Sequence, residues 1–322
     1  MPQDYRRFNG PEDSIPYQRF TQNFVKTYDE RYAELLDNDG KRRDGRALEE
    51  ARSMCMFYAK TDLVSQAKGS AYVELKKTKV VCSVFDPREI PHQNEFSQLG
   101  QIFCEVKFAP YACKGERRSP VPDAEEKALS VAMRQALEPC VCRYLFPNFQ
   151  IDIFVYILEN DGACLAAAIN CAGLALSNAA VPMYDIITSV SLAFIGNQIF
   201  VDPNYDEETL AIANTDSNTN HGTITLSSLP GLMQISEFRL VGSIDLENVT
   251  KAIELLQNEC NKILPIIQKI IVSDVVKNIN KKKELEEHAK KREEILNAKL
   301  EDILSIRLNL TLALDSFSIM AK

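Results

Sequence analysis

The sequence lacks long apolar runs and has few of the residues that build catalytic or metal sites. No run in its 322 residues approaches the roughly 18 apolar residues of a membrane-spanning helix, and the first residues have no apolar core, so we expect neither a membrane segment nor a signal peptide. Its three histidines, His92, His221 and His288, lie in polar stretches at spacings that do not suggest a catalytic triad. There is no Walker lysine loop, Gly-x-Gly-x-x-Gly or Cys-x-x-Cys, so no motif indicates a nucleotide-binding loop or a zinc site.

An excess of positive charge is also missing. Lys and Arg number 37 against 45 Asp and Glu, and the net charge of −8 excludes a uniformly basic nucleic-acid binder, although it allows a local basic stripe. The nine cysteines are odd in number and lie mostly in apolar stretches, as is typical of reduced, packed thiols in an intracellular protein. With 45% hydrophobic and 25% charged residues, the composition is that of an ordinary globular protein.

Composition and periodicity divide the chain into three parts. Residues 1–41 are polar and predict a loosely ordered lead-in that docks on a partner, and residues 42–276 predict an α+β domain of two βα halves. Residues 277–322 are first highly charged and then carry an apolar stripe at helical spacing (Leu296, Leu300, Ile303, Leu304, Leu308), which predicts an amphipathic helix. That helix either folds back on its own domain or binds a partner.

Inside the central part, strand and helix patterns alternate. The expected elements are strands at 69–75, 78–85, 102–110, 151–158, 187–195, 198–201, 210–214, 223–226 and 237–241, and helices beginning near residues 123, 164 and 246. Lys76-Lys77 predicts a hairpin turn and Asp123 a helix cap. Pro265 predicts the end of the helix that begins at Leu246.

Five segments in the same order resemble the RNase PH family. They are Leu63–Glu74 with Thr78–Val84; Arg43–Arg46; Glu116–Pro122; Ile157–Gly162 running into Ala168–Ala172; and Pro182–Asp185 with Val201–Pro203. The resemblance covers about residues 42–270 and implies an RNase PH-like core, which has the ribosomal protein S5 domain 2-like fold. Within the family, Ser65–Tyr72, Glu138-Pro139 and Met183–Asp185 are most similar to one type of ring subunit of the eukaryotic RNA exosome.

This resemblance implies partners and a cellular distribution. We expect a ring of RNase PH-like subunits built from three heterodimers, S1/KH cap subunits above it, and RNA that passes through the central channel to separate nucleases. We also expect roles in RNA processing and degradation, including rRNA processing and mRNA decay, and a location in nucleus, nucleolus and cytoplasm.

The segment that corresponds to the family's phosphate loop lacks the chemistry of phosphorolysis. Active members have Asp-Gly-Gly-Thr/Ser-Arg, whereas this chain has Asp161, Gly162, Ala163, Cys164 and Leu165. A thiol is a weak donor and leucine carries neither charge nor donor, so the loop forfeits roughly 1.5–3 kcal/mol for each charge-assisted hydrogen bond to phosphate. The sequence therefore predicts a protein without catalytic residues and without a cofactor.

The acidic half of the family's site is better preserved. The two aspartates of active members correspond to Asp202 and Glu208, with Asp206 and Glu207 between them. Such a group either holds Mg²⁺ or forms a solvated acidic turn between strands. The first possibility keeps open an active, phosphate- or Mg²⁺-dependent 3′–5′ exoribonuclease.

Lys114, Arg117 and Arg118 place three cations on the loop whose family counterpart faces the RNA path. They predict sequence-independent contact with RNA phosphates, with ordinary solubilising charge as the alternative. We expect Arg42, Arg43 and Arg46 to pair with acidic neighbours rather than with RNA. A stand-alone RNA-binding module is a third possibility, which the negative net charge disfavours.

Overall fold

The computed structural model describes residues 28–36, 41–51, 57–90, 96–114, 117–118, 121–196, 198–213 and 219–320, with the side chains of the last helix described up to residue 296. Residues 1–27 and 37–40 of the predicted lead-in, and residues 115–116 and 119–120 of the predicted basic loop, lie outside the described residues, as do the side chains of Leu300, Ile303, Leu304 and Leu308.

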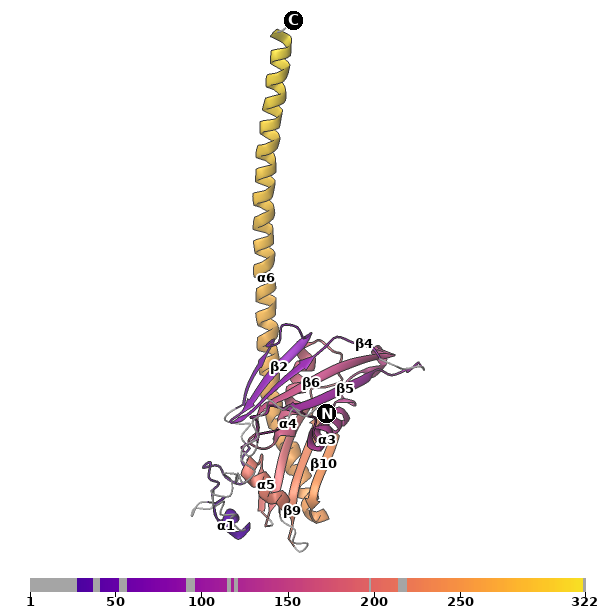
Figure 1. Ribbon diagram of the computed structural model, residues 1–322, viewed down its shortest axis with the longest axis vertical. Coiled ribbons are helices and arrows are strands. Elements are labelled where there is room, and N and C mark those ends of the chain that lie inside the picture. Colours follow the sequence, from indigo (N-terminus) through magenta and orange to yellow (C-terminus); the bar gives the residue numbers. More distant parts are fainter. Residues whose placement is uncertain are drawn as a thin grey trace, which may run out of the picture.

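Two β-sheets enclose a layer of helices (Figure 1). The first sheet has the order β1-β2-β3-β6, with β4 beside the start of β6 and β5 parallel to β6 on its other side. The second sheet is antiparallel, with the order β10-β9-β7-β8. The strands are β1 Phe57–Thr61, β2 Gly69–Leu75, β3 Thr78–Val84, β4 Arg88–Glu89, β5 Gln101–Phe108, β6 Phe149–Glu159, β7 Thr188–Ile195, β8 Gln198–Val201, β9 His221–Leu229 and β10 Gln234–Ser243.

The helices between the sheets form for identifiable local reasons. Helix α3 (Ala124–Leu137) begins with a capping box, in which the Asp123 side chain accepts a hydrogen bond from the Glu126 N–H and the Glu126 side chain accepts one from the Asp123 N–H at 3.2 Å. Helix α4 (Cys164–Asn178) is buried over most of its length, and its small residues let it pack against both sheets. The first turns of α6 (Leu246–Met320) complete the layer through buried residues such as Leu256 and Ile267.

A smaller core lies on the outer face of the second sheet. Helices α1 (Tyr28–Ala33) and α5 (Tyr205–Ala213) cover this face, where Ile195, Phe200 and Leu210 are buried together. This arrangement confirms the α+β fold class and most predicted elements, and a 3₁₀ turn at Arg143–Leu145 precedes β6.

Two predicted features are wrong. Residues 210–214 were expected as a strand, but residues up to Ala213 belong to α5, which begins where the Glu207 carboxylate accepts a hydrogen bond from the Asn204 N–H at 2.8 Å. The helix that begins at Leu246 does not end near Pro265. It continues to Met320, since Pro265 lies on the exposed side while Ile263 and Ile267 on either side of it stay buried.

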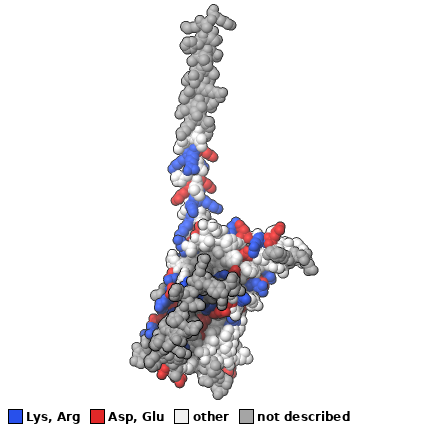
Figure 2. Space-filling model, viewed as in Figure 1, with Lys and Arg blue, Asp and Glu red and all other residues white. Residues whose placement is uncertain are grey.

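The C-terminal part of α6 projects away from the domain (Figure 1). All side chains described from Lys277 to Leu296 are exposed, and Figure 2 shows basic and acidic residues interspersed along this stretch. The structure therefore differs from the alternative in which the tail folds back on its own domain. Among the described helices, none is long and apolar enough to cross a membrane.

Candidate functional site: a degenerate phosphate loop

The loop between β6 and α4 is held by a chain of hydrogen bonds. The Asp161 N–H donates to Thr78 Oγ1 at 3.1 Å, the Thr78 hydroxyl donates to the Gly162 carbonyl at 3.0 Å, and the Gly162 N–H donates to Asn160 Oδ1 at 3.0 Å. Gly162 has φ +89°, and a Cβ built on it would lie 2.4 Å from the Pro203 carbonyl oxygen. The loop therefore packs directly on the chain segment that follows β8, and only glycine fits there.

The donor groups of this loop are already engaged or buried. The Ala163 N–H donates to Glu208 Oε2 at 3.3 Å, so a carboxylate of the same chain lies beside the start of α4. Cys164 is buried, and this burial raises the pKa of its thiol. Leu165 is only 6% exposed and belongs to the main hydrophobic core, at the position where active family members have the arginine.

A cavity of about 280 Å³ opens beside the loop. Cys164, Leu165 and Glu208 line it together with Arg239 of β10 and Glu125 of α3. Its charged lining thus combines one cation with two carboxylates. A phosphate dianion entering this cavity would meet Glu208 and Glu125 as well as the single guanidinium, which is unfavourable for phosphate binding.

The two carboxylates that correspond to the family's aspartates line different cavities. Asp202 is buried after β8, where Arg42 donates to its backbone carbonyl at 3.5 Å, and it lines a narrow gap with Ala166 and Asn170. Glu208 lines the cavity beside the loop instead. Within the described residues no group of three or more His, Cys, Asp or Glu is placed to hold a metal ion.

The acidic turn predicted at 206–208 is the first turn of α5. There Asp206, Glu207 and Glu208 lie at the positive end of the helix dipole, which stabilises their negative charge. This placement therefore stabilises the start of α5.

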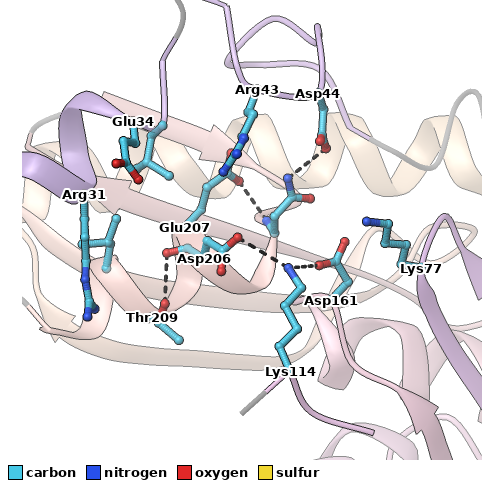
Figure 3. Close-up of a pocket in the computed structure, with 13 residues that line it drawn as sticks. Arg31, Glu34, Arg43, Asp44, Lys77, Lys114, Asp161, Asp206, Glu207 and Thr209 are labelled. Carbon is cyan, nitrogen blue, oxygen red and sulfur yellow. Dashed lines mark hydrogen bonds and ion pairs between the residues drawn. The ribbon is translucent and has the colours of Figure 1, made fainter. Parts of the chain in front are cut away.

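Lys114 joins the loop to α5 (Figure 3). Its ammonium group lies 2.8 Å from Asp161 Oδ1 and 3.4 Å from Asp206 Oδ2, at the edge of a pocket of about 620 Å³. Burial alone would lower the Lys114 pKa, but the hydrogen bonds and charges of the two carboxylates raise it. Lys114 therefore neutralises acidic residues of its own chain, a partnership that sequence spacing does not reveal.

Arg118 is also engaged within the chain. Its guanidinium lies 2.7 Å from Glu125 Oε2, donates to Cys113 Sγ at 3.1 Å and stacks 4.1 Å from the centre of the Phe108 ring. Arg117 is exposed. The three predicted RNA-contacting cations are thus near one another in sequence, but only Arg117 has no ion pair among the described residues.

The arginines near the start of the domain also differ in role. Arg42 is fully buried, contacts the Leu48 carbonyl, lies 3.6 Å from Glu207 Oε2 and stacks on Phe200. Arg46 pairs with Asp44 at 3.4 Å, so the predicted pairing of these two arginines with acidic neighbours is confirmed. Arg43 is exposed and lines the Figure 3 pocket.

Comparison with known proteins identifies the fold and the family. The model of the 3′ exoribonuclease family, domain 1 (RNase PH), matches residues 54–182. Human exosome complex component MTR3 is 32% identical over 288 residues, which cover 84% of this chain and 96% of that protein. Exosome complex component RRP41-like from Arabidopsis thaliana is 32% identical over 234 residues, covering 72% and 84%. The chain belongs to the RNase PH family.

Solved structures of low sequence identity share the RNase PH fold. The Archaeoglobus fulgidus exosome with RNA bound to the active site has a TM-score of 0.61 at 21% identity, covering 74% of this chain and 96% of the other. Rice Rrp46 has a TM-score of 0.58 at 20% identity, covering 71% and 100%. The resemblance stated from the sequence, to an exosome ring subunit of the mRNA transport regulator three (MTR3) type, is confirmed by the human MTR3 match and by mouse MTR3, which is 31% identical over 290 residues.

Proposed function

We propose that this chain is a non-catalytic structural subunit of the RNA exosome ring, which supports 3′-to-5′ RNA processing and degradation. In this role it holds an RNase PH-like heterodimer partner, supports an S1/KH cap subunit and lines the channel through which RNA passes. Its relatives are named exosome complex components, and this supports the assembly part of the proposal. The nucleus, nucleolus and cytoplasm are the proposed locations, by resemblance to the same family.

The observation that carries the non-catalytic part is the state of the phosphate loop. Phosphorolysis must hold a phosphate dianion beside the RNA phosphodiester, and this needs cations and donors. Here the arginine position is a core leucine, the Ala163 N–H is bonded to Glu208, and Lys114 is bonded to Asp161 and Asp206. The site has kept the shape of a phosphate loop without the means to bind phosphate.

Contact with RNA is proposed for a small number of exposed cations. Arg117 and Arg43 are exposed, whereas Lys114 and Arg118 are paired within the chain. Figure 2 shows acidic and basic residues interspersed on the described surface in this view. RNA contact by this subunit is therefore expected to be weak, dependent on salt and made to phosphates in passing.

Reconstitution tests the proposal. The chain is co-expressed with candidate RNase PH-like ring subunits, and the mass of the purified assembly is measured; we expect a stoichiometric complex. The complex is then incubated with 5′-labelled RNA with and without inorganic phosphate, in the absence of separate nucleases. We expect no shortening that depends on this chain. Recovery of the chain only as a free monomer contradicts the structural role, and shortening that is lost in Asp202→Ala contradicts the non-catalytic role.

A further inference from the structure

The part of α6 that leaves the domain receives no packing from the described parts of the chain. Ile270 and Ile271 still pack against the main core, but from Val275 to Leu296 every side chain is exposed. Most helical stability in proteins comes from packing of an apolar face, and isolated helices shorter than about 12–15 residues are marginal in water. Residues 275–296 therefore depend on interactions within the helix itself.

The base of this stretch is attached to the first sheet. The Thr61 hydroxyl, at the end of β1, donates a hydrogen bond to the Asp274 carboxylate, and Lys277 Nζ lies 3.5 Å from Asp274 Oδ1. Asp274 is half-buried, and the fully exposed stretch begins directly after it. The hydrogen bond thus holds α6 beside the end of β1 where it leaves the domain, and Figure 1 shows the helix pointing away from both sheets.

Residues 281–296 consist almost entirely of strong helix formers. Fourteen of these 16 residues are Ala, Leu, Lys, Arg or Glu, and there is no Gly or Pro. Leu285 is the only large apolar residue between Ile279 and Ile295, so the stretch lacks the continuous apolar seam of a coiled coil. Its composition therefore favours a helix that stands alone in water.

The charges of this stretch form two ladders of alternating sign. Residues four positions apart lie one turn apart on the same face of a helix, where opposite charges stabilise it and like charges destabilise it. The first ladder is Lys282, Glu286, Lys290 and Glu294, and the second is Lys283, Glu287 and Lys291. All five pairs in the ladders are of opposite charge, and no two Lys, Arg or Glu residues of like charge are four positions apart within 281–296.

We propose that residues 275–296 form a self-supporting helical arm, which the charge ladders stabilise and which holds the following segment at a fixed distance from the domain. At 1.5 Å per residue, an arm of this length extends about 33 Å. A partner of the segment after residue 296 is then met at that distance and not on the surface of the domain. The inference goes beyond the proposed function and does not depend on it, because the free chain has the arm.

Exchanging two charges without changing the composition tests the ladders. In Glu286→Lys with Lys290→Glu, both terminal pairs of the first ladder become pairs of like charge, whereas the matched control, Lys281→Glu with Glu284→Lys, keeps every ladder pair. Millisecond hydrogen exchange is measured on the full chain at 0.1 M salt. We expect the amides of 283–294 to exchange at least about tenfold faster in the first variant and within about twofold of the original chain in the control. Equal exchange in the two variants overturns the proposal.

Salt separates the charge ladders from helix propensity. The Debye length falls from about 10 Å at 0.1 M salt to about 3 Å at 1 M, so exchange of these amides should become faster in the original chain and slower in the first variant. Exchange that does not respond to salt in either chain overturns the role of the ladders. Protection that rises with the concentration of the chain shows that a second copy supports the helix, and this also overturns the proposal.

A distance measurement tests whether the arm is rigid. Spin labels are placed through non-natural amino acids at positions Asn278 and Ile295 of the full chain, 17 residues apart, which is about 26 Å along a helix. Pulsed electron resonance should give one narrow distance distribution in the original sequence and in the control, and a broader one in the first variant. A broad distribution in the original sequence overturns the fixed distance.

Discussion

Replacing Gly162 by alanine should lower stability in two ways, because alanine must adopt a left-handed backbone there and its Cβ must fit against a neighbouring segment. Gly162 and Gly45 both have positive φ, +89° and +79°, so alanine at either position pays for a left-handed backbone, about 1 kcal/mol. At Gly45 an added Cβ meets nothing within 4 Å, but at Gly162 it would lie 2.4 Å from the Pro203 carbonyl oxygen and 2.7 Å from the Tyr205 nitrogen. Because those atoms belong to the backbone, the segment must shift, which adds about 1–3 kcal/mol.

We therefore expect Gly45→Ala to lower the free energy of unfolding by about 1 kcal/mol and Gly162→Ala by about 2–4 kcal/mol. The assay is urea unfolding followed by tyrosine fluorescence, which reports the domain because the chain has 11 tyrosines and no tryptophan. Circular dichroism alone would be dominated by the long α6 helix. Equal losses in the two variants would refute the close contact between the loop and the segment after β8.

Three further predictions concern other parts of the chain. Arg42→Lys should lower the free energy of unfolding by about 2–4 kcal/mol in urea titrations, since lysine cannot both stack on the core and bond several carbonyls; a change below about 0.5 kcal/mol would contradict this. Burial raises the pKa of Glu237 to about 7 against the opposing charge of Arg239, so stability should fall as pH rises from about 5 to 8, and Glu237→Gln should flatten that slope; equal slopes would count against it. Leu165→Arg should not restore phosphate-dependent RNA shortening, because the Ala163 N–H stays bonded to Glu208 and the new charge enters the core; release of nucleoside diphosphates by this variant's assembly would show otherwise.

The elements that the sequence predicts correctly are those that depend on residues close together in the chain. Alternation predicted β2 and β3 around Lys76-Lys77, and Asp123 as a helix cap predicted the start of α3. The start of α5 carries the same kind of signal, because Asn204 is followed three residues later by Glu207, yet the apolar residues at 210–212 favoured a strand. Pro265 wrongly predicted the end of the helix. Because it lies on the exposed side, the carbonyl of the preceding turn that loses its N–H donor is open to water, and the helix continues.

Pairings between distant segments could not be predicted in the same way. The leucine at position 165, where active family members have arginine, is read directly from the sequence, whereas the hydrogen bond from the Ala163 N–H to Glu208 joins residues 45 positions apart. Lys114 and Asp161 are likewise brought together only by packing of the loop on α5. Charge alone therefore predicted that three cations contact RNA, but in the fold two of them, Lys114 and Arg118, form ion pairs within the chain.

Packing alone constrains the shape of the loop between β6 and α4, independently of any reaction. Gly162 is required by the approach of the Pro203 carbonyl, and Leu165 fills part of the core between the sheets, so both positions are constrained by packing alone. A carboxylate from α5 now accepts the N–H that an anion would need. Each of these residues contributes to the packing of the loop, and a mutation at one of them leaves the contacts of the other two in place. If the proposed non-catalytic role holds, building a phosphate site here requires several simultaneous changes, and most single steps toward it destabilise the fold.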